Sequence, residues 1–175
     1  MPPTSPRLAT SAAPQDGSFC HRPCQLRCGH DPIAAPVTAG RASVRREVRI
    51  ARPADEVWPL IGEPTRLPEW FPGIASATVD GTTRTVVTGA GLPMPEQIVT
   101  NDPLQRRFQY RLTGPMVRSH LSTIDVFDLG DGTCLVAYGA DAEPATMALV
   151  IAGAAGAALE HLRDLMEADQ TGGAR

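Results

Sequence analysis

A histidine and a serine two positions apart could carry out chemistry in this chain. His120 and Ser122 lie in a segment of alternating character, and alternate residues of a β-strand point to the same face. Because histidine titrates near neutral pH, His120 could act as a general acid or base. The alternative is that His120 only hydrogen-bonds to a ligand or to a neighbouring hydroxyl. Either role requires this face of the strand to line a pocket.

Thiols and an imidazole gather near the N-terminus. The segment "CHRPCQLRCGH" places Cys20, Cys24, Cys28 and His30 in the spacing C-x3-C-x3-C-x-H. These side chains can bind zinc, but zinc sites usually pair a C-x2-4-C knuckle with a second, distant pair of ligands. No such second cluster follows. The segment is a candidate metal site or redox-sensing thiol cluster, but the spacing favours neither role, and we predict no cofactor.

Several other functions are excluded by what the sequence lacks. It contains no phosphate-binding glycine loop that opens a helix, no HExxH and no G-x-S-x-G. A net charge of −3 provides no basic face for nucleic acid. The longest apolar run, at 145–159, is shorter than the roughly 18 residues that cross a bilayer. The N-terminus also lacks the apolar core of a secretory signal. We therefore predict a cytoplasmic protein that neither binds nucleic acid nor inserts stably into a membrane.

The composition changes sharply near residue 43. Residues 1–42 hold seven of the seventeen prolines and three of the four cysteines, with no periodic apolar pattern. Such a stretch buries too little apolar surface to offset the entropy lost on ordering, so we predict that it is disordered. One folded domain is expected over 43–170, followed by a disordered tail at 171–175.

The first elements of that domain place two aromatic residues in a loop. Residues 44–50 alternate between apolar and polar and predict a half-buried strand. A helix of about two turns is expected from Pro53, because the two acidic residues after it complement the positive end of a helix dipole. Prolines then prevent a longer helix, so Trp70 and Phe71 are presented from a stiff loop.

From residue 74 onward the pattern predicts a meander of strands. They are expected near 74–80, 83–90, 95–101, 105–113, 119–129 and 132–142. Asp-Gly pairs at 80–81 and 131–132 are hairpin signals. Phe108 and Tyr110 alternate with charged and polar residues, which is typical of an antiparallel sheet covered on one face.

The last predicted element is a long helix from residue 144 to about 168. Its apolar stripe follows positions 148, 152, 155, 159, 162 and 166. The first half of that stripe contains only alanines, Ala148, Ala152 and Ala155. Either the helix packs closely against the sheet there, or the alanines leave room for a ligand.

This order of elements resembles the START-like, birch-pollen-allergen-like superfamily (SRPBCC), in its polyketide cyclase/dehydrase and lipid-transport branch. The segments that carry the resemblance are "PADEVW" at 53–58, "WFPG" at 70–73, "DP-x3-R" at 102–107, and "DGT" with "EP" within 131–144. The resemblance implies an α+β helix-grip fold. In that fold a curved antiparallel sheet of about six to seven strands surrounds a long C-terminal helix, with short helices after the first strand.

The resemblance also implies an internal cavity. Trp70 and Phe71 would stand at its mouth beside the loop "GAGLPMP" at 89–95, which resembles the Gly-Leu-Pro gate of the plant abscisic-acid receptors. The latch sequence of those receptors and their ligand-anchoring lysine are both absent, so a hormone-receptor function is not carried over. The residues expected to bind the ligand are Trp70, Phe71, Leu92, Pro93, Phe108, Tyr110, Met116, His120, Ser122, Tyr138, Ala152 and Ala155.

Two functions from different classes follow. The favoured function is binding of a hydrophobic small molecule, a lipid or an aromatic polyketide-like compound, because the pocket signals are mainly apolar. The alternative is a polyketide cyclase or dehydratase with His120 as general acid or base, in which Ser122 and Tyr138 position the substrate. A regulatory protein without a ligand remains a third class. The sequence does not determine the oligomeric state.

Overall fold

The computed structural model describes residues 40–168 of the chain. Seven strands form one antiparallel sheet in the order β1-β7-β6-β5-β4-β3-β2. The elements are β1 (Ala42–Ile50), α1 (Ala54–Ile61), the 3-10 turn η2 (Pro64–Arg66), α2 (Leu67–Trp70), β2 (Ile74–Asp80), β3 (Thr83–Thr88), β4 (Pro93–Asp102), β5 (Arg107–Leu112), β6 (Ser119–Asp128), β7 (Cys134–Glu143) and α3 (Ala145–Ala168). The predicted α+β fold, with short helices after the first strand and a long C-terminal helix, is confirmed.

The first strand of the chain pairs with the last, at one edge of an open sheet. β1 runs antiparallel to β7, while β2 to β6 follow one another as a meander. The tight β2–β3 turn is made at Asp80-Gly81, where Gly81 has a φ of 60°, a backbone conformation that glycine adopts without the steric cost of a Cβ.

The candidate metal ligands Cys20, Cys24, Cys28 and His30 lie outside the described residues.

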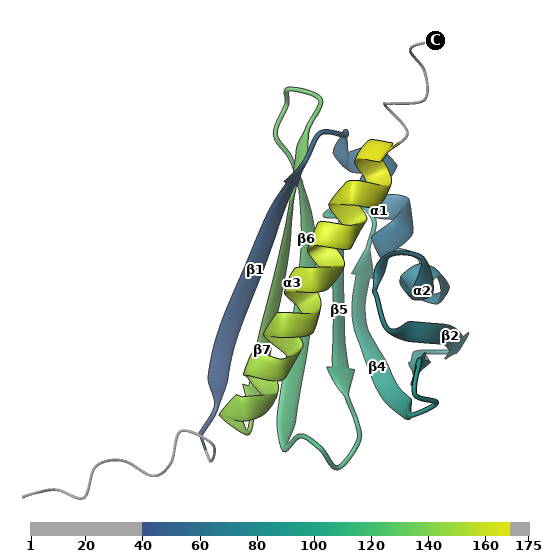
Figure 1. Ribbon diagram of the computed structural model, residues 1–175, viewed down its shortest axis with the longest axis vertical. Helices are drawn as coiled ribbons and strands as arrows, with labels where there is room; N and C mark the ends of the chain where they lie inside the picture. Colours follow the sequence, from purple (N-terminus) through teal and green to yellow (C-terminus); the bar gives the residue numbers. More distant parts are fainter. Residues whose placement is uncertain (1–39, 169–175) are drawn as a thin grey trace, which may run out of the picture. The chain divides into compact units, whose positions relative to one another are not determined.

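Helix α3 covers one face of the sheet. Figure 1 shows it running along β1, β7 and β6, with α1 and α2 beside its C-terminal half, and its contacts with β1 and β7 are the most extensive that it makes. Its buried stripe matches the predicted periodicity and comprises Ala145, Ala148, Ala152, Ala155, Ala158, Leu159 and Leu162. The small residues in the first half of this stripe bring helix and sheet close together.

Arg46 of β1 is a charged residue that lies where β1 and α3 pack closely together. Arg46 lies on the same face as the buried Val48, where the alternation predicts an apolar residue. Its side-chain atoms come within 3.6–3.9 Å of the point where a Cβ on Gly156 would lie. The arginine stem therefore packs on α3 at a glycine, and its charged end extends toward solvent.

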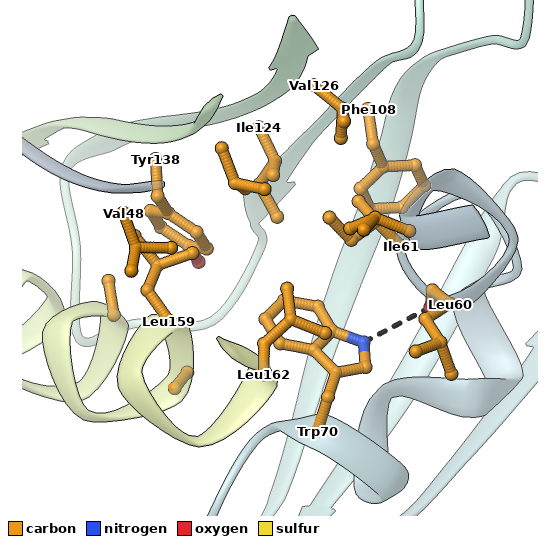
Figure 2. Close-up of a cluster of buried hydrophobic side chains, with 14 of the residues drawn as sticks. Val48, Leu60, Ile61, Trp70, Phe108, Ile124, Val126, Tyr138, Leu159 and Leu162 are labelled. Carbon is orange, nitrogen blue, oxygen red and sulfur yellow. Dashed lines mark hydrogen bonds between the residues drawn. The ribbon is translucent and has the colours of Figure 1, made fainter. Parts of the chain in front are cut away.

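The apolar core lies where the C-terminal half of α3 meets the sheet and the short helices. Figure 2 shows Leu159 and Leu162 of α3 facing Val48 and the Tyr138 ring, with Trp70 beneath them. Such burial of large apolar side chains is the main source of folding free energy.

Helix α3 is unusually apolar for a helix on a sheet. Within residues 40–168 it is the one helix that is long and apolar enough to cross a membrane by length and composition, with a mean hydropathy of 1.5 over 18 residues. This is weak evidence for a membrane span, because the core helix of a water-exposed domain passes the same test. Its buried stripe against β1 and β7 is typical of such a core helix.

Candidate functional site

A cavity of about 280 Å³ lies between α3 and the strands on the β3–β6 side of the sheet. Its wall is mainly apolar and draws on α2 and the turn after it, the six strands β2 to β7, the β5–β6 loop and the first half of α3. The apolar lining residues are Leu67, Phe71, Pro72, Ile74, Val86, Met94, Leu112, Met116, Ile124, Met147, Val150, Ile151 and Ala154. Such a wall suits the apolar part of a small molecule.

A second hollow of about 210 Å³ adjoins the first. It lies between the β3–β4 and β5–β6 loops, and three residues, Met94, Leu112 and Met116, line both hollows. Two of these shared residues are methionines, whose flexible side chains adapt readily to the shape of a neighbour. The predicted gate residues Leu92 and Pro93 line this second hollow rather than the main cavity.

The cavity also has a polar end, built by a buried ion pair. Register across the β3–β4 hairpin sets Arg84 opposite Glu96, and each side chain is less than 5% exposed. Arg84 Nε donates to Oε2 of Glu96 at 2.7 Å, and Nη2 lies 2.7 Å from the same oxygen as the ion-pair contact. The guanidinium carbon lies 4.7 Å from the centroid of the Tyr110 ring and 5.0 Å from that of Phe108. Cation–π contacts of this kind help to hold a desolvated arginine.

Burial changes the acidity of the carboxyl group in this pair. Removal from water raises the pKa of Glu96, and the attraction and hydrogen bonds of Arg84 oppose that rise without cancelling it. Burial of the ion pair therefore costs desolvation free energy, and each charged group depends on the other to offset that cost.

The candidate histidine lines the cavity with both ring nitrogens engaged. The backbone N–H of Leu112 donates to Nδ1 of His120 at 2.9 Å, so this nitrogen carries no proton. The proton of the neutral ring is then on Nε2, which donates to Ser122 Oγ at 2.9 Å. Desolvation lowers the pKa of His120 to about 4, although Asp141 acts to raise it. The ring is therefore neutral near pH 7.

The hydrogen bonds continue from Ser122 to two tyrosines. The Ser122 hydroxyl donates to Tyr138, and the hydroxyl groups of Tyr138 and Tyr110 are in direct hydrogen-bond contact. Both rings line the cavity. Desolvation is the main reason why the pKa of each phenol is raised, so both stay protonated. Together these groups form a continuous buried chain from Leu112 to the cavity wall.

The structure separates the predicted ligand-binding residues into three groups. Those that line the main cavity are Phe71, Tyr110, Met116, His120 and Tyr138. Ser122 lies directly behind His120 and is fully buried. Those outside the main cavity are Trp70, Phe108, Leu92, Pro93, Ala152 and Ala155.

Trp70 does not stand at the cavity mouth, where we expected it. It is 1% exposed in the core, and its indole N–H donates to the carbonyl of Leu60 at 3.1 Å, as Figure 2 shows. Phe71 packs against it, with ring centroids 5.7 Å apart, and faces the cavity instead. The reason is that Trp70 ends the four-residue helix α2, which turns the indole inward and leaves the next side chain at the wall.

The alanine stripe of α3 does not leave room for a ligand either. Ala152 and Ala155 are buried against β1 and β7, which is the close-packing alternative. The cavity is lined instead by the neighbouring face of the helix, through Met147, Ile151 and Ala154. Small residues on a helix allow a close approach to the sheet, and the hollow lies to the side, where the surfaces diverge.

The neighbouring residues Trp70 and Phe71 should therefore respond differently to substitution. Trp70→Phe removes the donor to Leu60 and should lower the free energy of unfolding by about 1–3 kcal/mol while leaving ligand affinity nearly unchanged. Phe71→Ala removes wall area and should weaken binding of a neutral aromatic probe by about tenfold. Urea unfolding and fluorescence titration of both variants check this. If Trp70→Phe alone lost ligand affinity, Trp70 and not Phe71 would be the residue that contacts the ligand.

The sequence indicated Glu96 as a possible exception among the surface carboxylates, but Arg84 and the pairing of the two at the polar end of the cavity were missed. Arg84 sits at an inward position two residues before Val86, where a charged residue is unusual. The observed turn at 89–91 pairs residue 88 with 92 and hence 84 with 96, whereas the loop was expected at 89–95, which gives another register. The cavity-facing residues of α3 gave no comparable signal.

The family comparison matches most of the described chain. Residues 41–167 match the family described as Polyketide cyclase / dehydrase and lipid transport. No curated protein sequence matches the chain.

Solved structures share the fold at low sequence identity. The protein XoxI from Bacillus cereus is 24% identical over 71% of this chain and 95% of its own, with a TM-score of 0.68. A START superfamily protein from Mycobacterium smegmatis is 18% identical over 74% and 97%, with a TM-score of 0.56. Norcoclaurine synthase from Thalictrum flavum, solved with dopamine and hydroxybenzaldehyde, is 18% identical over 74% and 88%, with a TM-score of 0.58. At these identities the likeness shows the fold alone.

Proposed function

The chain belongs to the polyketide cyclase / dehydrase and lipid transport family, and from this membership we propose that it binds a hydrophobic small molecule in the cavity beside α3. Membership supports a ligand-binding or cyclase role. The observation that carries the proposal is the 280 Å³ cavity, with apolar walls and a single polar end. A cytoplasmic location stays a prediction from the sequence.

The size and chemistry of the cavity limit the ligand class. The volume lies just below the range of roughly 300–1,000 Å³ that is usual for small-molecule sites, so a compact ligand of about two fused rings fits better than a long lipid. Each buried methylene contributes about 0.8 kcal/mol, so apolar contact alone gives useful affinity. An aromatic polyketide-like compound combines this size with polar oxygens. A longer ligand would need to displace Met94 or Met116 and enter the second hollow.

Native mass spectrometry of the full-length protein tests the proposal directly. The protein is measured as purified, then after incubation with the neutral two-ring ketone 2-acetylnaphthalene, beside its denatured mass. We expect an organic adduct that disappears on denaturation, in at least one of the two samples. The bare chain mass in both would contradict the proposal.

A second candidate function is a cyclase or dehydratase reaction. The alternative in the sequence analysis assigned the acid or base to His120, whose nitrogens are both engaged within the protein. Glu96 favours this function more, because it lines the cavity and burial raises its pKa toward the range useful for proton transfer. Recovering the bound compound after incubation and recording its mass and NMR spectrum separates the two functions. Loss of one water indicates dehydration, and a changed spectrum at unchanged mass indicates ring closure. An unchanged mass and an unchanged spectrum together indicate binding only.

Two alanines of α3 provide a matched test of where the ligand lies. Ala154 lines the cavity at an exposed position, so Ala154→Leu should weaken binding of 2-acetylnaphthalene about tenfold and change stability by less than about 0.5 kcal/mol. Ala152 packs on the sheet at 2% exposure, so Ala152→Leu should lower the free energy of unfolding by about 1–3 kcal/mol. Titration and urea unfolding of both variants check this. Stronger inhibition of binding by Ala152→Leu than by Ala154→Leu would move the ligand to the other face of α3.

A further inference from the structure

We infer that the polar end of the cavity selects a neutral ligand with a hydrogen-bond-accepting oxygen, such as a ketone, over a carboxylate of the same size. This inference rests on the proposed function and specifies the substrate class of that same site. Three features of the described residues carry it: a balanced charge, two atoms of the ion pair without partners, and a fixed direction of hydrogen bonding.

The charge of the cavity wall is balanced before any ligand arrives. Arg84 and Glu96 supply one positive and one negative charge, and no other ionised side chain from the described part of the chain lines the cavity. A carboxylate would add a second negative charge against a single positive one. Because the side chains of this pair are less than 5% exposed, an uncompensated charge beside them is costly. A neutral ligand meets no such penalty.

The geometry of the ion pair leaves two atoms available to a ligand. Nε and Nη2 of Arg84 both contact Oε2 of Glu96, and no group within residues 40–168 hydrogen-bonds to Arg84 Nη1 or to Glu96 Oε1. No fully buried side-chain nitrogen or oxygen in that range lacks a partner, so these two atoms must be accessible from the cavity that their residues line. Nη1 is a donor and can bind an acceptor oxygen.

A second donor follows from the order of hydrogen bonds behind His120. The amide of Leu112 can only donate, so His120 donates to Ser122 and Ser122 donates to Tyr138. The two phenols hold two protons, and their mutual hydrogen bond uses one. Among the described residues nothing else accepts from either phenol, so the remaining proton is directed into the cavity. The backbone amide therefore fixes the tyrosine pair as a donor toward the ligand.

The two donors belong to neighbouring side chains on the wall of one cavity. The guanidinium carbon of Arg84 is 4.7 Å from the centroid of the Tyr110 ring, and both residues line the same cavity. A carbonyl oxygen has two lone pairs and can accept from both donors. The free oxygen of Glu96 beside them disfavours a second carboxylate by charge repulsion and can accept from a hydroxyl on the ligand.

Three probes of matched size test the selection in the full-length protein. They are 2-acetylnaphthalene, 2-naphthoate and 2-isopropylnaphthalene, which present a ketone, a carboxylate and no oxygen on the same ring system. At pH 7 we expect the ketone to bind tightest and the carboxylate weakest by fluorescence titration, with a difference of at least about tenfold between them. A carboxylate that binds as tightly as the ketone overturns the inference.

Two variants change the selection in opposite ways. Glu96→Gln leaves Arg84 as the sole charge, so the preference should shift toward 2-naphthoate by at least about tenfold. Tyr110→Phe combined with Tyr138→Phe removes both phenolic hydroxyls and keeps the ring shapes, so the ketone should lose its advantage over the hydrocarbon. A merely structural role would change all three affinities together. The double tyrosine variant retains the ion pair and tests the inference even if Glu96→Gln fails to fold.

The outcomes separate this inference from the proposed function. Equal binding of ketone and hydrocarbon by the wild-type protein overturns the selection, while the apolar site stands. Binding of none of the three probes overturns both.

Discussion

Replacing Glu96 with glutamine is expected to lower the free energy of unfolding by about 3–5 kcal/mol at pH 7. Arg84 is 3% exposed, and its hydrogen bond and ion pair with Oε2 are part of what offsets its removal from water. Glutamine keeps the shape and an acceptor oxygen but loses the negative charge, so a buried guanidinium remains uncompensated. Urea unfolding of the variant beside the wild-type protein measures the difference.

Replacing Arg84 instead of Glu96 should lower the free energy of unfolding by less, because a buried carboxylate can become neutral and a buried guanidinium cannot. In Arg84→Met the isolated carboxyl of Glu96 can take up a proton, whereas arginine in Glu96→Gln cannot lose one. Without Arg84 the already raised pKa of Glu96 rises further. The folded state then binds more protons than the unfolded state in the pH range between the two pKa values. The stability of Arg84→Met should therefore fall as the pH rises through that range.

Replacing both partners provides the control. Arg84→Met with Glu96→Leu removes the charges together, and methionine keeps a favourable contact with the Phe108 and Tyr110 rings. This double variant should come within about 1.5 kcal/mol of the wild-type stability. If Glu96→Gln proves no less stable than the double variant, the pair is not held in a desolvated site as the structure indicates. Adding 2-naphthoate should restore part of the stability of Glu96→Gln alone.

The elements could be predicted from the sequence because their signals are local. The Asp80-Gly81 hairpin and the stripe of α3 depend only on neighbouring residues, and both were found where expected. The pairing of Arg84 with Glu96 was also available in principle, since a hairpin turn fixes its own register. It was missed because inward-facing charges are rare and because a loop extending to residue 95 implies a different register.

The faces of the site could not be predicted in the same way. Alanines at 148, 152 and 155 show that one face of α3 carries small side chains. The distance between helix and sheet, however, depends on the side chains of both the helix and the sheet at the point where they meet. β7 is also rich in small residues where α3 crosses it, with Ala140 and Ala142 buried on the inward face. Small residues on both surfaces close the gap, so the hollow forms elsewhere. Trp70 and Phe71 posed the same problem. A shift of one residue in the end of α2 decides which of these two side chains faces the cavity.

The role of His120 was beyond the sequence for a different reason. An intrinsic pKa near neutrality made it a candidate acid or base, and its pairing with Ser122 was visible in the alternation. The state of the ring depends on which groups meet its two nitrogens. One of these is the backbone amide of Leu112, which has no signature in the side-chain pattern.

That buried neutral ring should make the protein sensitive to acid. The pKa of His120 is about 4 in the folded state, against 6.5 in an unfolded chain. Between these values the unfolded chain binds a proton on His120 that the folded protein does not. The free energy of unfolding should therefore fall as the pH is lowered from about 6.5 to about 4, by roughly 3 kcal/mol in total, and His120 should contribute no further loss below that. Urea unfolding at several pH values measures this.

Comparison with His120→Gln isolates the contribution of this one ring. Glutamine can still donate to Ser122 but does not titrate, so the difference in stability between the two proteins should shrink as the pH falls. Carboxyl groups titrate in both proteins and cancel in the comparison. A constant difference from pH 7 to pH 4 would mean that the imidazole titrates normally and is hydrated. The hydrogen bond from Leu112 would then not fix the ring, and the tyrosine pair would lose its imposed direction toward the ligand. Acid sensitivity and ketone selection therefore depend on the same backbone amide.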